Sequence, residues 1–192
     1  MTPSALRSLA FLVPLWLLLT TAGAQFNVDS LQQLLARASA PTERVRLMRK
    51  LCTADDTGIM ERYGRELVRY ADSLLAHGPK ADRDLLVAKG KGFWGIGRSF
   101  AFRGMIDSTI YWWEQALPLW EAAKDEKMMA LGRSQLSQKL LSAGDIRRAI
   151  GLLNSALPYH RTAGDSASII DDHMFLGRAY DMLGDYPRSL DH

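Results

Sequence analysis

Three closely spaced glycines form the one pattern in the sequence that could cradle a phosphate group. Gly90, Gly92 and Gly95 match the spacing G-x-G-x-x-G. In dinucleotide-binding proteins this motif follows a β-strand and opens a helix inside a βαβ unit. No neighbouring segment is typical of a strand. The sequence therefore favours a helix crowded with glycine over a nucleotide site.

The histidines and carboxylates give no pattern typical of catalysis or metal binding. No pair of histidines has the spacing that would place two metal ligands on one helix face. Asp171, Asp172 and His173 are adjacent, but acidic residues are also typical of the first turns of helices, where they oppose the helix dipole. There is no G-x-S-x-G nucleophile elbow. We predict no catalytic residue, no metal and no cofactor.

Cys52 is the single cysteine, which excludes an intramolecular disulfide and a thiolate-rich metal site. Leu47, Met48 and Leu51 surround it at helical spacing. We therefore expect a small buried side chain rather than a reactive thiol.

Charge is balanced along the whole chain. Among 192 residues there are 24 Lys and Arg against 21 Asp and Glu, a formal net charge of +3. The two signs are interspersed and no basic block occurs, so the sequence does not predict a nucleic-acid partner.

The elements that carry these residues follow an internal period of 40. Gly104, Gly144 and Gly184 are spaced by 40 positions each, and the triplets Ala116-Leu117-Pro118 and Ala156-Leu157-Pro158 recur at the same offset. After each glycine, apolar side chains recur at intervals of three and four, which places them on one face of a helix. A glycine between two such stripes ends one helix and lets the chain reverse.

Each unit is therefore predicted to be two antiparallel helices that small residues allow to approach closely. The fold class that follows is all-α, an antiparallel helix-hairpin solenoid. The positions to which we assign a structural role in the repeat are Gly97, Gly104, Ala116, Gly144, Ala149, Ala156, Gly177, Tyr180 and Gly184.

The runs L-G-R-A-Y-D-M-L-G-D-Y-P-R-S-L (176–190) and A-G-D-I-R-R-A-I (143–150) resemble tetratricopeptide (TPR) repeats. The longer period of 40 is similar to the repeats in the exported N-terminal regions of bacterial sensor histidine kinases and nucleotide cyclases. The resemblance covers residues 82–192 well and 41–81 loosely. It implies a superhelix that binds a protein or peptide through its concave face.

Two features fit the repeat pattern less well. Pro118 and Pro158 fall inside the second helix of their units, where we expect a kink or an early end. The glycines at 90–97 should make their helix the least regular. Residues 41–81 are expected to form a degenerate first hairpin, and the last repeat, with a helix beginning near Tyr186, looks truncated. We expect the face of Leu176 and Tyr180 to be partly uncovered, as in a fragment.

Residues 1–24 are typical of a secretory signal, with Arg7, an apolar stretch and the small residues Ala22-Gly23-Ala24 before the cleavage point. The alternative is an uncleaved membrane anchor, because Ser8 to Val28 carry no charge. Residues 25–40 are expected to be a linker. The protein is then exported to the periplasmic or extracellular side of the cytoplasmic membrane. A membrane association needs either the uncleaved segment or a transmembrane helix beyond residue 192.

The resemblance also selects the residues that would face a partner. They are Lys91, Trp94, Arg98, Gln138 and Arg178. The predicted function is a protein-interaction scaffold of the cell envelope. The alternatives are the sensory N-terminal region of a truncated signalling protein and, in another class, a hydrolase or nucleotide enzyme, against which the lack of a convergent acid, base or metal set argues.

Overall fold

The computed structural model describes residues 27–79 and 82–192, and this part of the chain consists of α-helices joined by short turns, without a β-strand. The all-helical fold class is confirmed, whereas the predicted signal of residues 1–24 lies outside the described residues. Residues 27–37 are helical and precede α2. The following helices are α2 (Pro41–Leu51), α3 (Thr57–His77), α4 (Arg83–Phe102), α5 (Ile106–Ala122), α6 (Glu126–Ala143), α7 (Ile146–Ala163), α8 (Ser166–Met182) and α9 (Tyr186–Leu190).

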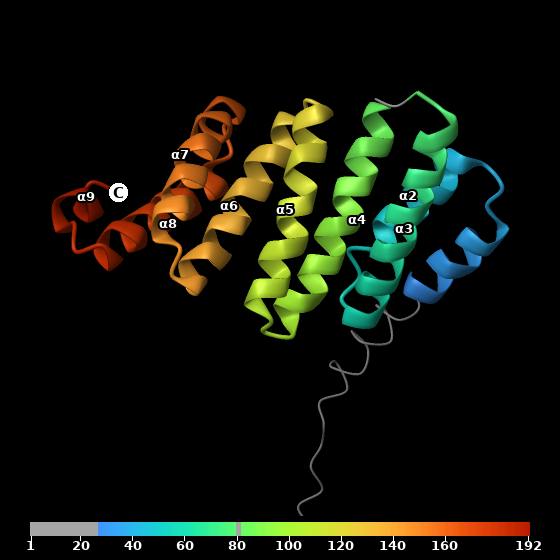
Figure 1. The fold of residues 1–192 in the computed structure, drawn as a ribbon, viewed down its shortest axis with the longest axis horizontal. Coiled ribbons are helices and arrows are strands. Elements are labelled where there is room, and N and C mark those ends of the chain that lie inside the picture. The colour runs from blue at the N-terminus through green and yellow to red at the C-terminus, as the bar shows by residue number, and fades with distance from the viewer. Residues whose placement is uncertain (1–26, 80–81) are drawn as a thin grey trace, which may run out of the picture.

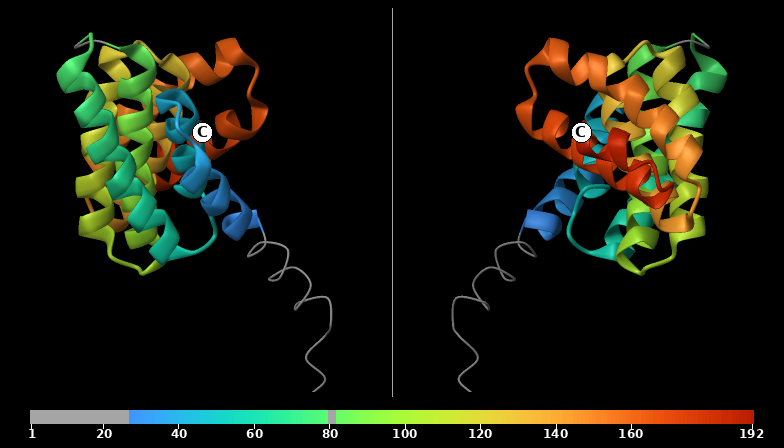
Figure 2. Two further views of the ribbon diagram at one scale, coloured as in Figure 1. Left: turned by 90° about the vertical axis from the view of Figure 1, so that its right-hand side faces the viewer. Right: turned by 90° about the vertical axis from the view of Figure 1, so that its left-hand side faces the viewer.

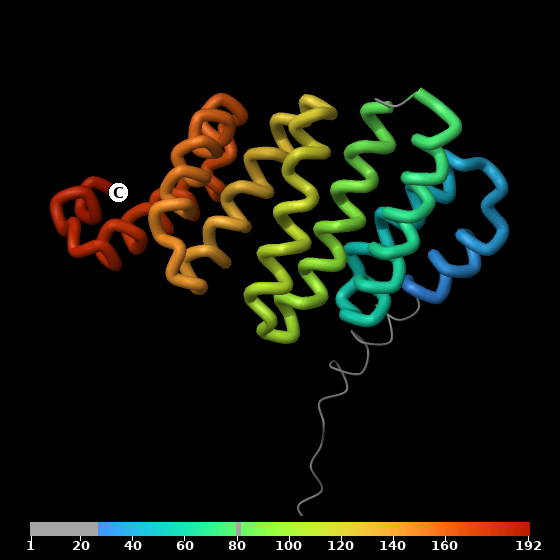
Figure 3. The backbone as a smooth tube through the Cα atoms, in the orientation of Figure 1, coloured from blue at the N-terminus to red at the C-terminus, as the bar shows by residue number. Residues whose placement is uncertain are grey.

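Each helix packs against the next one in the sequence, from α2 to α9. In Figure 1 the helices stand side by side in a row, with α2 and α3 at one end and α9 at the other. The tube in Figure 3 shows the chain running up and down along this row. Seen along the row in Figure 2, the first and last described helices lie to the same side of α4 and α5. The row is therefore curved.

The three repeat glycines occupy equivalent turns. Gly104, Gly144 and Gly184 lie between α4 and α5, α6 and α7, and α8 and α9, with φ of +73°, +84° and +73°. The residue after each glycine donates its backbone N–H back to the last helical turn, as in Asp145 N to Leu140 O at 2.9 Å. This closure suits a residue of positive φ, which glycine adopts without a steric cost.

Small residues on the hairpin faces let the helices touch. Ala116, Ala149 and Ala156 are fully buried. A Cβ added to Gly97 would lie 2.4 Å from Cδ1 of Trp113, and Gly177 faces the carbonyl of Ser189. The large neighbours fill the space that the small residues leave, which gives close packing between α4 and α5.

Helix α4 is continuous over 20 residues, so the expected irregularity is not seen. Gly90, Gly92, Gly95 and Gly97 are all buried in it. A Cβ on Gly90 would lie 2.3 Å from Nε1 of Trp120, and one on Gly92 would lie 2.8 Å from Val68. The intrinsic cost of glycine in a helix is offset because these sites admit neighbouring side chains into close contact.

The prolines do not end their helices. Helix α5 continues past Pro118 to Ala122, and α7 continues past Pro158 to Ala163. Both prolines are exposed. The backbone carbonyl that each proline leaves without its helical donor is therefore on the side of the helix that water can reach.

Two other expectations differ from the structure. Residues 27–37 are a helix rather than a linker, and Leu35 is buried against the core of α2 and α3. Leu176 is fully buried and Tyr180 is 8% exposed, so their face is covered. The ring of His192 stacks on Tyr180 with centroids 5.6 Å apart.

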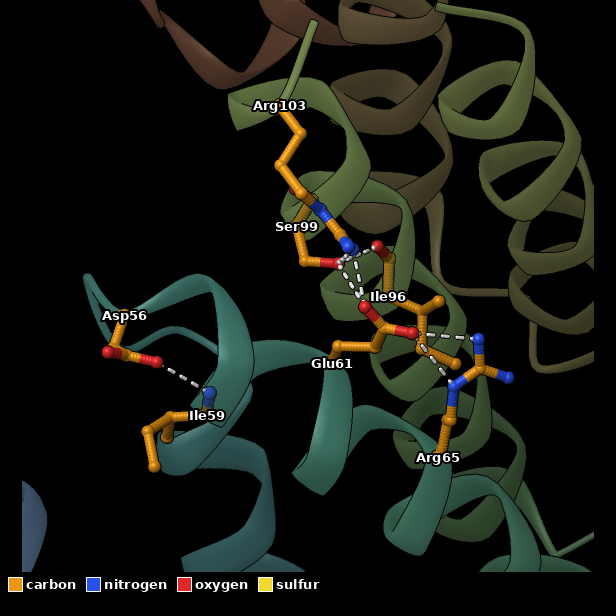
Figure 4. Close-up of polar contacts among 7 residues, drawn as sticks. All are labelled: Asp56, Ile59, Glu61, Arg65, Ile96, Ser99 and Arg103. Carbon is orange, nitrogen blue, oxygen red and sulfur yellow. Dashed lines mark hydrogen bonds and ion pairs between the residues drawn. The ribbon is translucent and has the colours of Figure 1, made fainter. Parts of the chain in front are cut away.

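An ion-pair network fixes α4 against α3 (Figure 4). The carboxylate of Glu61 accepts hydrogen bonds from Arg65, at 2.9 Å, and from Arg103, whose guanidinium also contacts the hydroxyl of Ser99. Burial disfavours the ionised Glu61, but the hydrogen bonds from Arg65 and Arg103 outweigh burial and lower its pKa. This network holds the C-terminal end of α4, from which Arg98 and Phe102 project.

Candidate functional site

An open groove with a volume of about 540 Å³ runs across three helices that are not consecutive. Helices α4, α6 and α8 are the first members of their hairpins, and one side chain of α5 completes the lining. The lining residues are Arg98, Ala101, Phe102, Trp113, Leu131, Ser134, Gln135, Gln138, Lys139, Ser168, Asp171, Asp172, Met174 and Phe175.

The groove combines exposed apolar side chains with charges of both signs. Phe102 on α4 is 60% exposed and Met174 on α8 is 55% exposed, which is unusual for side chains of this size. Arg98 lies on the α4 side, with its guanidinium 5.4 Å from the ring of Phe102. Asp171 and Asp172 lie on the α8 side. The two outer walls therefore differ in charge.

The structure brings only part of the predicted partner-binding set into this groove. Arg98 and Gln138 line it, from α4 and α6. Lys91 lies earlier on α4, partly buried, and its pKa is lowered by burial and by the positive charges of Arg49 and Lys127. It does not line the groove.

The other two predicted residues have different surroundings. Trp94 stacks on Trp113 with ring centroids 4.0 Å apart, so it belongs mainly to the packing between α4 and α5. Arg178 is exposed on α8, outside the groove lining.

A buried polar cluster lies at the groove, contributed by α6, α7 and α8. Ser134 Oγ and His160 Nε2 share a hydrogen bond of 3.3 Å. Oδ2 of Asp172 lies 3.8 Å from the same nitrogen, which is too far for a hydrogen bond. The side chains of His160 and Asp172 are 1% and 0% exposed, and neither carboxylate oxygen of Asp172 has a hydrogen-bond partner.

This polar cluster replaces an apolar one at the equivalent place of the preceding repeat. Subtracting 40 from Ser134, His160 and Asp172 gives Trp94, Trp120 and Gly132. There the rings of Trp94 and Trp120 lie 5.3 Å apart, and a Cβ on Gly132 would lie 2.7 Å from Trp120. Sequence reasoning missed the cluster, although comparing the repeats position by position would have shown three polar residues in place of two tryptophans and a glycine.

The cluster is not arranged as a nucleophilic triad. In such a triad the serine and the carboxylate bind opposite nitrogens of the imidazole ring. Here Ser134 and Asp172 both face Nε2, and Nδ1 has no hydrogen-bond partner, with Asp165 at 3.9 Å. Because Asp165 is beyond hydrogen-bond distance of Nδ1, the three groups do not form the continuous hydrogen-bonded chain of a triad.

Burial raises the pKa of the Asp172 carboxyl above its ordinary value. The hydroxyl of Ser134 and the ring of His160 act in the opposite direction without cancelling this effect. Ser134 lies close enough to favour the charged form, although its hydroxyl does not reach hydrogen-bond geometry with either oxygen of Asp172. Asp172 is therefore a carboxyl group held in an environment that disfavours its charge.

The remaining motifs lie in packed helices. The glycine-rich segment 90–95 is in the interior of α4, far from any helix N-terminus where a phosphate could bind. Burial raises the pKa of the Cys52 thiol to about 12. Within residues 27–79 and 82–192, no three His, Cys, Asp or Glu side chains are grouped as a metal site.

Over the same described ranges, no helix has both the length and the apolar character needed to cross a membrane. Comparison with known proteins gave no match, either to the models of protein families or to curated proteins.

Proposed function

We propose that this protein is a TPR-like helical solenoid that binds a peptide segment of a protein partner in the groove of α4, α6 and α8. The repeat architecture is supported by three turns with a glycine of positive φ spaced by 40 residues. It is also supported by the stepwise packing of each helix on the next. A stack of helical hairpins exposes one helix of each pair along a continuous surface, which is the usual binding surface of solenoids.

The observation that carries the binding function is the groove itself. It draws on three separate hairpins and exposes Phe102 and Met174 on opposite sides. Large exposed apolar side chains rimmed by polar ones are typical of surfaces that bind another protein. Gln135, Gln138 and Lys139 on α6 could hydrogen-bond to the backbone of an extended peptide between them.

Export belongs to the same proposal. The signal-like pattern of residues 1–24 supports a location outside the cytoplasm, and a scaffold without a catalytic set suits a role in binding there. Sequencing the N-terminus of the protein recovered from cells would test this part, because a mature chain that begins at Gln25 is expected.

The binding function can be tested with a random peptide library displayed on phage. The library is selected on the intact protein, and the peptides recovered are measured against two variants. Phe102→Asp places a charge in the groove, whereas Tyr111→Asp makes the same kind of change at a side chain that is 55% exposed on α5 and does not line it.

We expect the recovered peptides to bind Phe102→Asp at least about tenfold more weakly, as for the loss of a central apolar contact. Binding to Tyr111→Asp should stay unchanged. Failure to recover any peptide, or equal loss in both variants, would contradict a peptide-binding groove.

A further inference from the structure

We propose that the groove contains an acidic subsite, centred on Asp172 and supported by Asp171, that receives a lysine or arginine side chain of the bound peptide. This inference rests on the proposed function, because it specifies what the peptide must contribute. The partner is thus a protein segment with a basic residue beside an apolar one.

The carboxylate of Asp172 is unsatisfied within the chain. Both oxygens of Asp172 have less than 1 Å² exposed and no hydrogen-bond partner, although the residue lines the groove. Buried carboxylates in folded proteins are normally paired or hydrogen-bonded, since burying them alone is costly. The nearest donors of the chain, Ser134 and His160, do not form a hydrogen bond to it, whereas a ligand ammonium or guanidinium would supply charged donors.

The fold does not require this carboxylate. The preceding repeat makes the same junction with Trp94, Trp120 and Gly132, where the buried Nε1 of Trp120 donates to the backbone oxygen of Val87 at 3.4 Å and no carboxylate is present. The polar residues of this junction leave Nδ1 of His160 and both oxygens of Asp172 without a hydrogen-bond partner, and buried polar groups in that state cost stability. Departures of this kind from the rule of apolar packing are characteristic of functional sites.

The charge and the apolar surface around Asp172 suit a basic side chain. Asp171 is exposed beside it and adds negative charge where a ligand would approach. Met174 and Phe175 lie within the following turn of α8 and line the same groove. They offer an apolar surface for the alkyl stem of a basic side chain, whose charged end would then reach Asp172.

Access requires a small local change. Ser134, on the facing helix α6, is only partly buried and lines the groove next to Asp172. Rotation of the two side chains would expose a carboxylate oxygen to the groove. The Ser134 hydroxyl can then accept a further hydrogen bond from the same ammonium group.

The test combines peptide selection with a double-mutant cycle. The random phage library is selected on the intact protein, and the tightest-binding peptide is synthesised with and without its basic residue replaced by glutamine. Both peptides are titrated against the wild-type protein, Asp172→Asn and the control Asp181→Asn. Asp181 is an exposed carboxylate on the same helix that does not line the groove.

We expect lysine or arginine to be enriched among the selected peptides. Asp172→Asn should weaken the basic peptide about tenfold and leave its glutamine analogue unchanged, because the lost interaction is between those two groups. Asp181→Asn should affect neither peptide. Thermal unfolding of each variant establishes that it is folded.

The outcomes separate the two proposals. Groove-dependent binding without enrichment of basic residues, or with equal losses for the basic peptide and its analogue, would overturn the subsite and leave the groove function standing. Asp171→Asn provides a second variant of the same charge should Asp172→Asn fail to fold, and it is expected to weaken the basic peptide selectively. Recovery of no groove-dependent peptide would overturn both proposals.

Discussion

At the junction that contains Asp172 and His160, polar residues stand where the preceding repeat has tryptophans and a glycine, and part of their hydrogen-bonding capacity is unsatisfied. The indole of Trp120 is fully buried, whereas His160 in the equivalent place has an Nδ1 atom without a hydrogen-bond partner. Buried polar groups of this kind cost free energy when unsatisfied. The cluster is therefore expected to be a weak point of the folded protein as well as a candidate for binding.

The stability of the protein should rise when the charge of Asp172 is removed. Because its folded pKa lies above the ordinary value of 3.8, the ionised group destabilises the folded state at neutral pH. We expect Asp172→Asn to increase the free energy of unfolding at pH 7 by about 1 kcal/mol, the difference between burying a charge and burying an amide.

The stability difference between the wild-type protein and Asp172→Asn should depend on pH. The penalty of the wild-type carboxylate disappears as the pH falls through its raised pKa, since protonation then favours the folded state. The difference between the wild-type protein and Asp172→Asn in urea unfolding should therefore shrink between pH 7 and pH 4. A difference that grows toward pH 4 would show that the carboxylate is instead stabilised by a partner.

The thiol of Cys52 should not react with thiol reagents in the folded protein. Burial raises the pKa of its thiol from 9.0 to about 12, so the thiolate is about a thousandfold scarcer than for a free cysteine. We expect no reaction with a thiol reagent at pH 8 until denaturant unfolds the chain, after which one thiol per chain reacts. Fast labelling without denaturant would contradict the buried position.

At the scale of the helices, the sequence predicts the turns well and the interior of α4 poorly. Positive φ at Gly104, Gly144 and Gly184 follows from local chemistry that the sequence shows directly. The regularity of α4 depends on what lies beside its glycines, such as Trp120 against Gly90. Tertiary contacts of this kind override the helix propensity of single residues and are not visible in a local pattern.

The glycines of α4 should be irreplaceable where a neighbouring ring occupies their space. A Cβ on Gly90 would overlap Trp120, whereas one on Gly151, an exposed glycine inside α7, meets nothing within 4 Å. We expect Gly90→Ala to lower the free energy of unfolding by about 1–3 kcal/mol through overpacking. The identical change at Gly151 should raise it by about 1 kcal/mol, because alanine favours helices. Equal effects at the two positions in thermal unfolding would contradict the packing assigned to α4.

A glycine at position 124, in the turn between α5 and α6, should increase the stability of the protein. Lys124 has a φ of +51°, and the residue 40 positions later is Gly164, with a φ of +66°. Residues other than glycine are strained in this backbone conformation, because their Cβ atom lies too close to the following carbonyl oxygen. We expect Lys124→Gly to stabilise the protein by about 1 kcal/mol and Gly164→Ala to destabilise it by a similar amount, as seen in chemical denaturation. Destabilisation by Lys124→Gly would mean that the strain is compensated by contacts of the lysine.

For the whole molecule, the period of 40 residues predicts which helices are equivalent and which of their residues share a face. It places Arg98 and Gln138 on successive first helices, and the structure brings both to one groove. It could not predict that Trp94 would stack on Trp113, because that contact depends on how α4 and α5 pack within their hairpin. Nor could it predict that Asp172 would be buried without a hydrogen-bond partner, because this depends on how α8 packs against the preceding hairpin. The helix at 27–37 also escaped prediction, since its core contact through Leu35 is made with α2 and α3, where the repeat pattern is degenerate.

The most direct test of the binding proposal is to map the bound peptide by amide hydrogen exchange. The intact protein is compared with and without the tightest peptide from the phage selection. Slower exchange in α4, α6 and α8 is predicted, with α5 and α7 changed less, because the groove is lined almost entirely by the first helix of each hairpin. Protection concentrated in α5 and α7, or none in α6, would contradict binding in this groove.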